Sequence, residues 1–349
     1  MRTPSLQWHP RALRGFRERG VKQPMTEKYE QDSAVASLPE SDAERRATAV
    51  AATIARAAVD QADYAMRNWT DPTPGPIRIG SAEHLRMFCN MLLQTHNPYK
   101  PAVIDWPKLA PDALRRVTTL PIWDIAVQTE GRASVRVHAF ASGVRDPLLR
   151  SALEMDGDEE ARHKVVLSKL VEAYGIALEP EPEYPVPADP EWGWLATGYS
   201  ECIDSFAAFG LFAAARQSGF FPEELVETFE PVIQEEGRHI LFFVNWAAWY
   251  RRSLPWWRRP FYTLKVWRVW IHLIRERIGI AKGIDTGDSV QDANFPMNTS
   301  GALTESMTPG ALIDLCLVEN ERRMAGYDAR LLRPNFVPKL ARLARRFVK

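Results

Sequence analysis

Apolar residues recur at three- and four-residue spacing along most of this chain, which is the period of amphipathic α-helices. Segments rich in proline or glycine separate one periodic stretch from the next. No stretch alternates apolar and polar residues between hairpin turns, so the predicted fold class is all-α. The predicted helices cover approximately residues 42–68, 81–96, 113–143, 148–174, 190–217, 222–250 and 308–326.

Two of the connections are short and should fold the long helices back as antiparallel hairpins. In "GVRDP" (143–147), Asp146 can cap the following helix and Pro147 suits its first turn. In "QSGFFP" (217–222), Pro222 again stands at the start of the next helix. The acidic, Pro-rich stretch "EPEPEYPVPADPEWG" between the two hairpins predicts a long extended crossover.

Two polar pairs interrupt the apolar sides of these helices. The motifs "EEARH" and "EEGRH" each place a glutamate three residues before a histidine, namely Glu160 before His163 and Glu236 before His239. The positions one heptad away are apolar, so each pair lies on a stripe that should face a core. Burying such groups costs on the order of several kcal/mol unless something compensates, and a metal ion would compensate. One such pair is close to chance, but two matching copies on apolar stripes are not.

A dinuclear metal site between four helices also needs one carboxylate from each of the other two helices, at the same height. Residues at equal height in an antiparallel hairpin are equally far from its turn. Glu130 and Glu160 have their midpoint in the first turn, and Glu201 and Glu236 have theirs in the second. The predicted metal ligands are therefore Glu130, Glu160, His163, Glu201, Glu236 and His239. The rival carboxylates, which fit the midpoint test less well, are Glu154, Asp156 and Asp204.

The residues beside these motifs indicate supporting roles. Glu159 and Glu235 can hydrogen-bond the imidazoles of the ligands, or else lie at the surface. Arg162 and Arg238 are expected to neutralise nearby carboxylates rather than to contact a substrate. Asp204, one helical turn after the ligand of the third long helix, is a further neighbour of the predicted centre.

Four carboxylates and two imidazoles suit two iron or manganese ions better than zinc or calcium. Such a metal pair can reduce dioxygen and generate an oxidant for an inert C–H bond or an amine. Small residues on the same face as Glu130, among them Ala126 and Ala133, would leave space for oxygen or a substrate. Close packing between helices is the alternative explanation of those small residues.

The order of these motifs resembles the ferritin-like di-iron carboxylate superfamily over about residues 113–250. The arginine before each histidine is most similar to the O₂-activating branches: bacterial multicomponent monooxygenases, acyl-carrier-protein desaturases and the aerobic magnesium-protoporphyrin ester cyclase. The resemblance implies a ferritin-like four-helix bundle with two iron ions, or a manganese and an iron ion. It also implies that Glu130 and Glu201 are the single-carboxylate ligands, and that each Glu-x-x-His supplies a shared carboxylate and a terminal histidine. Leu167 stands where the ribonucleotide reductase small subunit has its radical tyrosine, which disfavours that branch.

The expected function is therefore an O₂-dependent oxidoreductase, that is, a hydroxylase, desaturase or oxidative cyclase acting on an apolar or lipid-like organic substrate. The chain has no G-x-G-x-x-G, P-loop or nucleophile elbow, so its electrons should come from a separate reductase or ferredoxin. Two alternatives stay open: a ferritin-like iron oxidase or peroxidase without an organic substrate, and a non-enzymatic helical scaffold at a membrane surface.

Composition adds constraints on compartment and partners. The 349 residues contain 44 Lys+Arg and 44 Asp+Glu, so no overall charge attracts nucleic acid, and no nucleic-acid partner is expected. Three widely spaced cysteines form no C-x-x-C pair and indicate a reducing compartment. No secretory signal or apolar stretch long enough for a membrane span occurs, so the protein is expected to be cytoplasmic.

The chain is expected to have four parts: a basic irregular segment (1–40), N-terminal helices with a Pro-rich connector (41–111), the di-metal helical bundle (112–250), and a Trp/Arg-rich segment with a last helix and a basic tail (251–349). Residues 250–280 combine four tryptophans with eight basic residues and one acid. That mixture is typical of membrane interfaces, although a helix lying on the bundle, with arginine stems covering apolar surface, is the favoured explanation. Together with the basic ends, which should be solvated and disordered, it makes a peripheral membrane contact the second expectation for location.

Overall fold

The computed structural model describes residues 42–101, 106–120, 122–281 and 307–348. Within those ranges the secondary structure is helical and contains no strand, which confirms the predicted all-α class. The chain divides into two units, 1–60 and 61–349. The first unit contributes the beginning of α1 (Asp42–Arg67), and its predicted irregular segment lies outside the described residues. The second unit contains the other helices: α2 (Ala82–Gln94), α3 (Pro111–Thr118), α4 (Trp123–Ala141), α5 (Pro147–Ala173), α6 (Pro190–Gln217), α7 (Glu223–Ser253), α8 (Arg259–Ala281), α10 (Pro309–Met324) and α11 (Phe336–Ala344).

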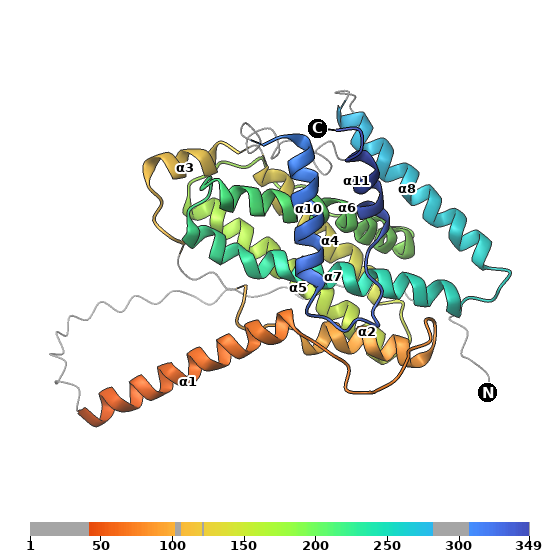
Figure 1. The fold of residues 1–349 in the computed structure, drawn as a ribbon, viewed down its shortest axis with the longest axis horizontal. Coiled ribbons are helices and arrows are strands. Elements are labelled where there is room, and N and C mark those ends of the chain that lie inside the picture. Colours follow the sequence, from red (N-terminus) through yellow and green to blue (C-terminus); the bar gives the residue numbers. More distant parts are fainter. Residues whose placement is uncertain (1–41, 102–105, 121, 282–306, 349) are drawn as a thin grey trace, which may run out of the picture. The chain divides into compact units, whose positions relative to one another are not determined.

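The two predicted hairpins are present, because α4 packs against α5 and α6 against α7 (Figure 1). Asp146 caps α5 by accepting a hydrogen bond from the Leu149 backbone N–H over 2.9 Å, and Pro147 occupies the first turn. Pro222 precedes α7, and Gly219 turns the chain with a φ of +67°. Further contacts join α4 to α6 and α5 to α7, while α2 contacts both α5 and α7. The four long helices therefore lie side by side around a common interior.

Two expectations about the helices were wrong. The helix predicted over 113–143 is two helices: α3 ends at Thr118 and α4 begins at Trp123. Leu120 precedes Pro121 in the sequence, and a residue before proline disfavours helical backbone angles. The basic tail was expected to be disordered, but it contains α11. Pro338 of α11 is buried, so part of the tail packs on the protein.

Helix α10 lies so close to α6 that only glycine fits at position 210. A β-carbon on Gly210 would lie 2.3 Å from Cys316 Sγ and 2.9 Å from the backbone nitrogen of Cys316, well inside van der Waals contact. Because part of this clash is with backbone, no side-chain rotation relieves it. The register of α10 on α6 therefore depends on this glycine.

Gly210→Ala is expected to lower the free energy of unfolding by about 3 kcal/mol, because α10 must move away from α6. Urea denaturation followed by circular dichroism measures the change. Gly237→Ala is the control, since a β-carbon there would meet nothing closer than 3.8 Å and would turn EEGRH into the EEARH of the first motif. That change is expected to be neutral or stabilising by about 1 kcal/mol. Equal effects of the two substitutions would contradict the close α6–α10 contact.

No helix among the described residues is both long enough and apolar enough to cross a membrane.

Candidate metal centre

The six predicted ligand side chains come from four helices. They are Glu130 of α4, Glu160 and His163 of α5, Glu201 of α6, and Glu236 and His239 of α7. Both imidazoles are fully buried, and Glu160 is 2% exposed. The side chains of Glu130 and Glu236 keep 17% and 15% of their surface exposed, on the wall of a cavity. The structure therefore brings these residues together inside the protein rather than at its surface.

His163 directs its Nδ1 atom toward two carboxylates from neighbouring helices. Nδ1 lies 3.2 Å from Glu236 Oε1 and 3.6 Å from Glu130 Oε2. Neither contact has hydrogen-bond geometry, so Nδ1 has no hydrogen-bond partner within the described part of the chain. The hydroxyl of Ser205 fixes Glu236 by donating to Oε2 over 3.1 Å. With Glu160 these side chains form a group whose possible ligand atoms all lie within 4.8 Å of one another, a spacing that can hold a metal ion.

His239 repeats this arrangement on the other side of Glu160. Its Nδ1 lies 2.8 Å from Glu160 Oε1, again without hydrogen-bond geometry, and both atoms lack a hydrogen-bond partner among the described residues. The two imidazole rings lie 5.6 Å apart, centre to centre, and are inclined by 30°. This separation is less than the diameter of one helix, roughly 10 Å. Glu160 thus stands between the two histidines and belongs to a metal-compatible group with each of them.

The Nε2 atom of each imidazole hydrogen-bonds a glutamate of the other five-residue motif. His163 Nε2 lies 2.8 Å from Glu235 Oε2, and His239 Nε2 lies 2.7 Å from Glu159 Oε2. A carboxylate accepts, so each Nε2 is the donor and carries a proton. The hydrogen bonds predicted for Glu159 and Glu235 are therefore present. In the neutral imidazole they leave the lone pair on Nδ1, the atom that faces the ligand carboxylates.

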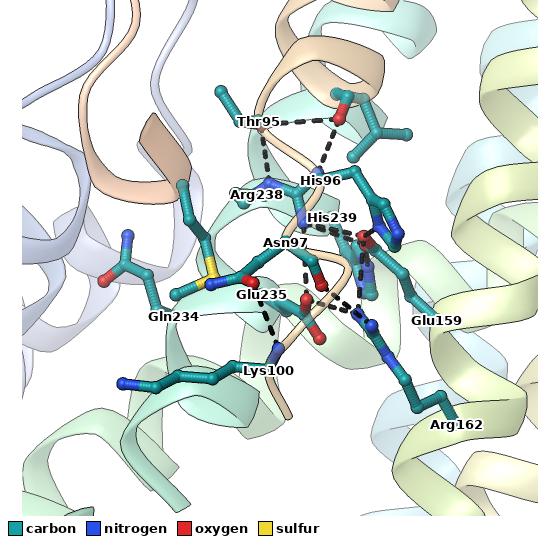
Figure 2. A network of polar contacts seen from close by, with 12 residues as sticks. Thr95, His96, Asn97, Lys100, Glu159, Arg162, Gln234, Glu235, Arg238 and His239 are labelled. Atoms are coloured by element: carbon teal, nitrogen blue, oxygen red, sulfur yellow. Dashed lines mark hydrogen bonds and ion pairs between the residues drawn. The ribbon is translucent and has the colours of Figure 1, made fainter. Parts of the chain in front are cut away.

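The arginine of each motif likewise donates hydrogen bonds to a glutamate of the other motif. Arg238 donates to both carboxylate oxygens of Glu159, over 2.9 and 3.0 Å, and its Nε donates to Thr95 Oγ1 over 2.7 Å (Figure 2). Arg162 donates to Glu235 Oε1 over 2.6 Å. Each arginine therefore neutralises the carboxylate that orients a histidine, as predicted, and neither of the two is hydrogen-bonded to a ligand carboxylate.

Electrostatics distinguish the orienting carboxylate Glu159 from the predicted ligand Glu160. Burial would raise the pKa of Glu159, but the charge of Arg238 and hydrogen bonds from His239 and His96 hold it well below its usual range. Burial, together with the charges of Glu130 and Glu236, raises the pKa of Glu160 well above its usual range. Glu159 is consequently charged and paired, whereas Glu160 is buried in an excess of negative charge.

Glu201 and the two histidines lie in the same excess of negative charge, whereas for Glu236 the contact and charge of His163 outweigh burial and lower its pKa. Burial, together with the charges of Asp156 and Glu236, raises the pKa of Glu201 well above its usual range. Burial would lower the pKa values of both histidines, but the surrounding carboxylates outweigh it and raise them well above the usual range. In the metal-free protein, protons on these side chains compensate the negative charge of the centre. A bound metal cation would compensate the same charge.

No protein-family model, curated protein or solved structure matches this chain. The chemistry of the centre therefore has to follow from its own side chains.

Glu201, Glu154 and Asp204 lie outside the compact ligand groups around the two histidines, and their surroundings differ. Glu201 lines the cavity beside Glu236, but it is not part of either compact ligand group. Glu154 is exposed, so it cannot be a ligand of this buried centre. Asp204 forms an ion pair with Arg277, with oxygen–nitrogen distances of 2.7 and 2.8 Å, and accepts a hydrogen bond from Ser200. The structure thus gives Asp204 partners of its own.

Asp156 and His96 contribute more than their sequence positions indicated. Asp156 is 2% exposed, and its Oδ1 lies 3.4 Å from His239 Nε2, which is the side of the ring away from Glu160. Burial is the main reason that the pKa of Asp156 rises to about 6. Asp156 lies one helical turn before Glu160, so the spacing signal was available. His96 Nδ1 contacts Glu159 Oε1 over 2.6 Å, and no local pattern around His96 predicted this contact.

A cavity of about 220 Å³ adjoins the centre. All four predicted carboxylate ligands line it, and so do the small residues Ala126 and Ala133 of α4. Towards the α6–α7 turn its wall is mainly apolar, with Leu211, Phe212 and Phe229 among the lining residues. Arg132, Arg136 and Ser200 line it as well.

A second, smaller cavity of about 20 Å³ lies beside α8 and shares Arg136 and Ser200 with the first. Its other lining residues include His272 and Glu276 of α8. The centre therefore borders a cavity that is mainly apolar. The polar end of this cavity lies toward α8.

Proposed function

We propose that this protein is a ferritin-like di-metal oxidoreductase, which binds two iron ions, or a manganese and an iron ion, and uses dioxygen to oxidise an apolar or lipid-like organic substrate. One observation carries the proposal. Two buried Nδ1 atoms without hydrogen bonds and four carboxylates from four helices meet at the wall of an apolar cavity. The proposed ligands are Glu130, Glu160, His163, Glu201, Glu236 and His239.

The donor set fits a pair of such metals. Arg238 is paired with Glu159 and Arg162 with Glu235, so neither of these arginines compensates the ligand carboxylates, whose burial makes uncompensated negative charge costly. Carboxylate oxygens combined with imidazole nitrogens suit iron and manganese. The pairing of Glu160 with both histidines supports its assignment as the shared carboxylate.

The protein's own residues would prepare the centre for metal binding. Glu159 and Glu235 hold the Nε2 protons, so that each Nδ1 offers its lone pair inward. Metal binding would release the protons held by the ligand carboxylates. The bound metal pair would supply Lewis acidity and redox capacity for the reduction of dioxygen. Because the sequence contains no flavin or nicotinamide motif, a separate reductase or ferredoxin is the proposed electron donor.

The cavity favours an organic substrate over the alternative of an iron oxidase or peroxidase. Iron and peroxide need access to the metals but no apolar chamber. Here apolar residues from α4, α6 and α7 form a chamber of about 220 Å³ directly beside Glu130 and Glu236. A molecule in that chamber would lie against the metal ligands and away from bulk water.

Metal titration of the full chain tests the proposal. Chelator-treated protein titrated anaerobically with Fe(II) is expected to bind two ions per chain and to unfold at a higher temperature when loaded. Addition of oxygen to the reduced, loaded protein should consume dioxygen. A chain that binds neither iron nor manganese after reconstitution would overturn the proposal.

Ala208→Trp is expected to separate substrate binding from metal binding. Ala208 lines the cavity on α6, and an indole there would fill much of the chamber. Dodecanol, used as an apolar probe in calorimetry, is expected to bind at least tenfold more weakly, while the metal content stays at two ions. Val186→Trp, at a position that is 63% exposed, is the control and should change neither quantity. If Ala208→Trp binds dodecanol as tightly as the wild type does, the cavity is not the substrate site.

A further inference from the structure

Helix α8 and the turn before it present a row of large apolar side chains to solvent. Their exposed fractions range from 48% at Ile271 and Ile274 to 79% at Trp256, and they recur mostly every three or four residues. The opposite side of α8, which includes Tyr262, Val269 and Leu273, is buried against the protein. The exposed row consists of Trp256, Trp257, Phe261, Leu264, Trp267, Ile271 and Ile274.

Helix α11 adds a second exposed row beside the first. Three of its members lie on α11 and the fourth, Phe347, follows the end of the helix; they are spaced by four, three and four residues and are 46% to 82% exposed. Phe336, the first of them, packs against Trp270 of α8 with ring centres 4.6 Å apart, and Figure 1 shows the two helices next to each other. The second row consists of Phe336, Leu340, Leu343 and Phe347. We call the two rows together the α8–α11 face.

Positive charge accompanies this face, and the acidic residues that flank it are paired with its basic side chains: Asp189 with Lys265, Asp314 with Arg345 and Glu321 with Arg342. Arg258, Arg268 and Arg275 are exposed and form no ion pair with any residue that the structure describes. The sequence from 329 to the end contains no acidic residue. Glu276, the one acidic residue between 250 and 281, has a side chain only 22% exposed and contacts His272 over 3.3 Å.

We propose that the α8–α11 face docks flat on the surface of a lipid bilayer that carries anionic headgroups. At helical spacing, Arg268 and Arg275 lie within the apolar row of α8 rather than beside it. A second copy of this chain would set the same unpaired arginines against them, and like charges facing each other across an interface oppose association. At a bilayer surface their long side chains reach up to lipid phosphates while the neighbouring rings and aliphatic groups enter the headgroup region.

The mixture of residue types agrees with an interfacial position. Tryptophan is enriched where headgroups meet the hydrocarbon core, and each Arg or Lys near an anionic surface strengthens binding about fivefold. The described helices contain no membrane-spanning candidate, so α8 and α11 would lie on the bilayer rather than cross it. His272, which lines the small cavity next to the candidate metal centre, also borders this face. On the proposed function, lipid-like substrates would have a short path from the bilayer to the cavity.

Vesicle co-sedimentation of the full-length protein tests this inference without measuring metal content or turnover. Vesicles of phosphatidylcholine mixed with phosphatidylglycerol are expected to bind the protein, and phosphatidylcholine alone much less. The binding should weaken as the salt concentration rises. Arg268→Gln should weaken it about fivefold, and the double substitution Phe261→Ser with Leu264→Ser at least tenfold.

Two controls change exposed residues elsewhere: Lys169→Gln on α5 for the charge and Val186→Ser for the apolar group. Both should bind vesicles like the wild type. Because all the substituted positions are exposed, circular dichroism is expected to show the same folded protein throughout. Failure to bind the mixed vesicles, or equal binding by all variants, would overturn the inference. A wild-type dimer in size-exclusion chromatography that Phe261→Ser with Leu264→Ser converts to a monomer would assign the face to a second copy instead, and would leave the proposed metal chemistry untouched.

Discussion

Glu160→Ala is expected to reduce the metal content from two ions per chain to none, because Glu160 belongs to a metal-compatible group with each of the two histidines. Losing it removes a ligand from both metal-compatible groups at once. His239→Ala should also abolish tight binding at its own half of the centre. Metal analysis of iron-reconstituted protein measures the content, and far-UV circular dichroism checks that the helices remain.

Glu154→Ala is the matched control, since Glu154 is a glutamate of the same helix but is exposed to solvent. It should retain both metals. The substitution at Glu160 is not expected to unfold the metal-free chain, because this carboxylate is buried among the like charges of Glu130 and Glu236. If the folded Glu160→Ala protein still binds two metal ions, the metal site lies elsewhere in the protein.

Arg238→Met is expected to lower the free energy of unfolding of the metal-free protein by about 3–5 kcal/mol. Arg238 is fully buried and neutralises Glu159, which is 1% exposed. The substitution keeps much of the apolar volume but leaves a carboxylate buried without its counter-ion, which is the costly part. Urea denaturation at constant pH measures the loss.

The comparison is with Arg115→Met, which breaks an ion pair with Asp112 at the surface, where both side chains are at least 70% exposed. That loss should stay below about 1 kcal/mol. Combining Arg238→Met with Glu159→Gln should recover part of the stability, because no unpaired charge is then left in the interior. A cost for Arg238→Met no larger than that for Arg115→Met would contradict the structural role assigned to the crossed pair.

The sequence was most informative where a local rule sets the structure. Helix limits followed from hydrophobic spacing and from caps such as Asp146, which the structure places at the start of α5. The midpoint rule selected Glu130 correctly as a neighbour of His163, because hairpin geometry converts sequence distance into height. The break between α3 and α4 was also available, since Pro121 signals it.

The remaining features depend on tertiary register, which no local pattern encodes. That Arg238 hydrogen-bonds Glu159 of α5, while it lies 3.9 Å from Glu235 one turn earlier on its own helix, follows only from how α5 and α7 face each other. His96 reaches the same carboxylate from the end of α2, a segment with no motif of its own. The choice between Glu201 and rival carboxylates such as Asp156 depends on differences smaller than one helical turn, which periodicity does not resolve.

The crossed pairing of the two motifs has a consequence for the order of assembly. Hairpin α4–α5 supplies His163, but the glutamate that orients it belongs to hairpin α6–α7, and the reverse holds for His239. Neither hairpin alone can therefore form half of a competent centre, even though each carries a complete Glu-x-x-His. During biosynthesis, metal uptake would have to wait until the second hairpin has emerged from the ribosome and docked. A nascent chain that stops before α7 should scavenge no metal at this site.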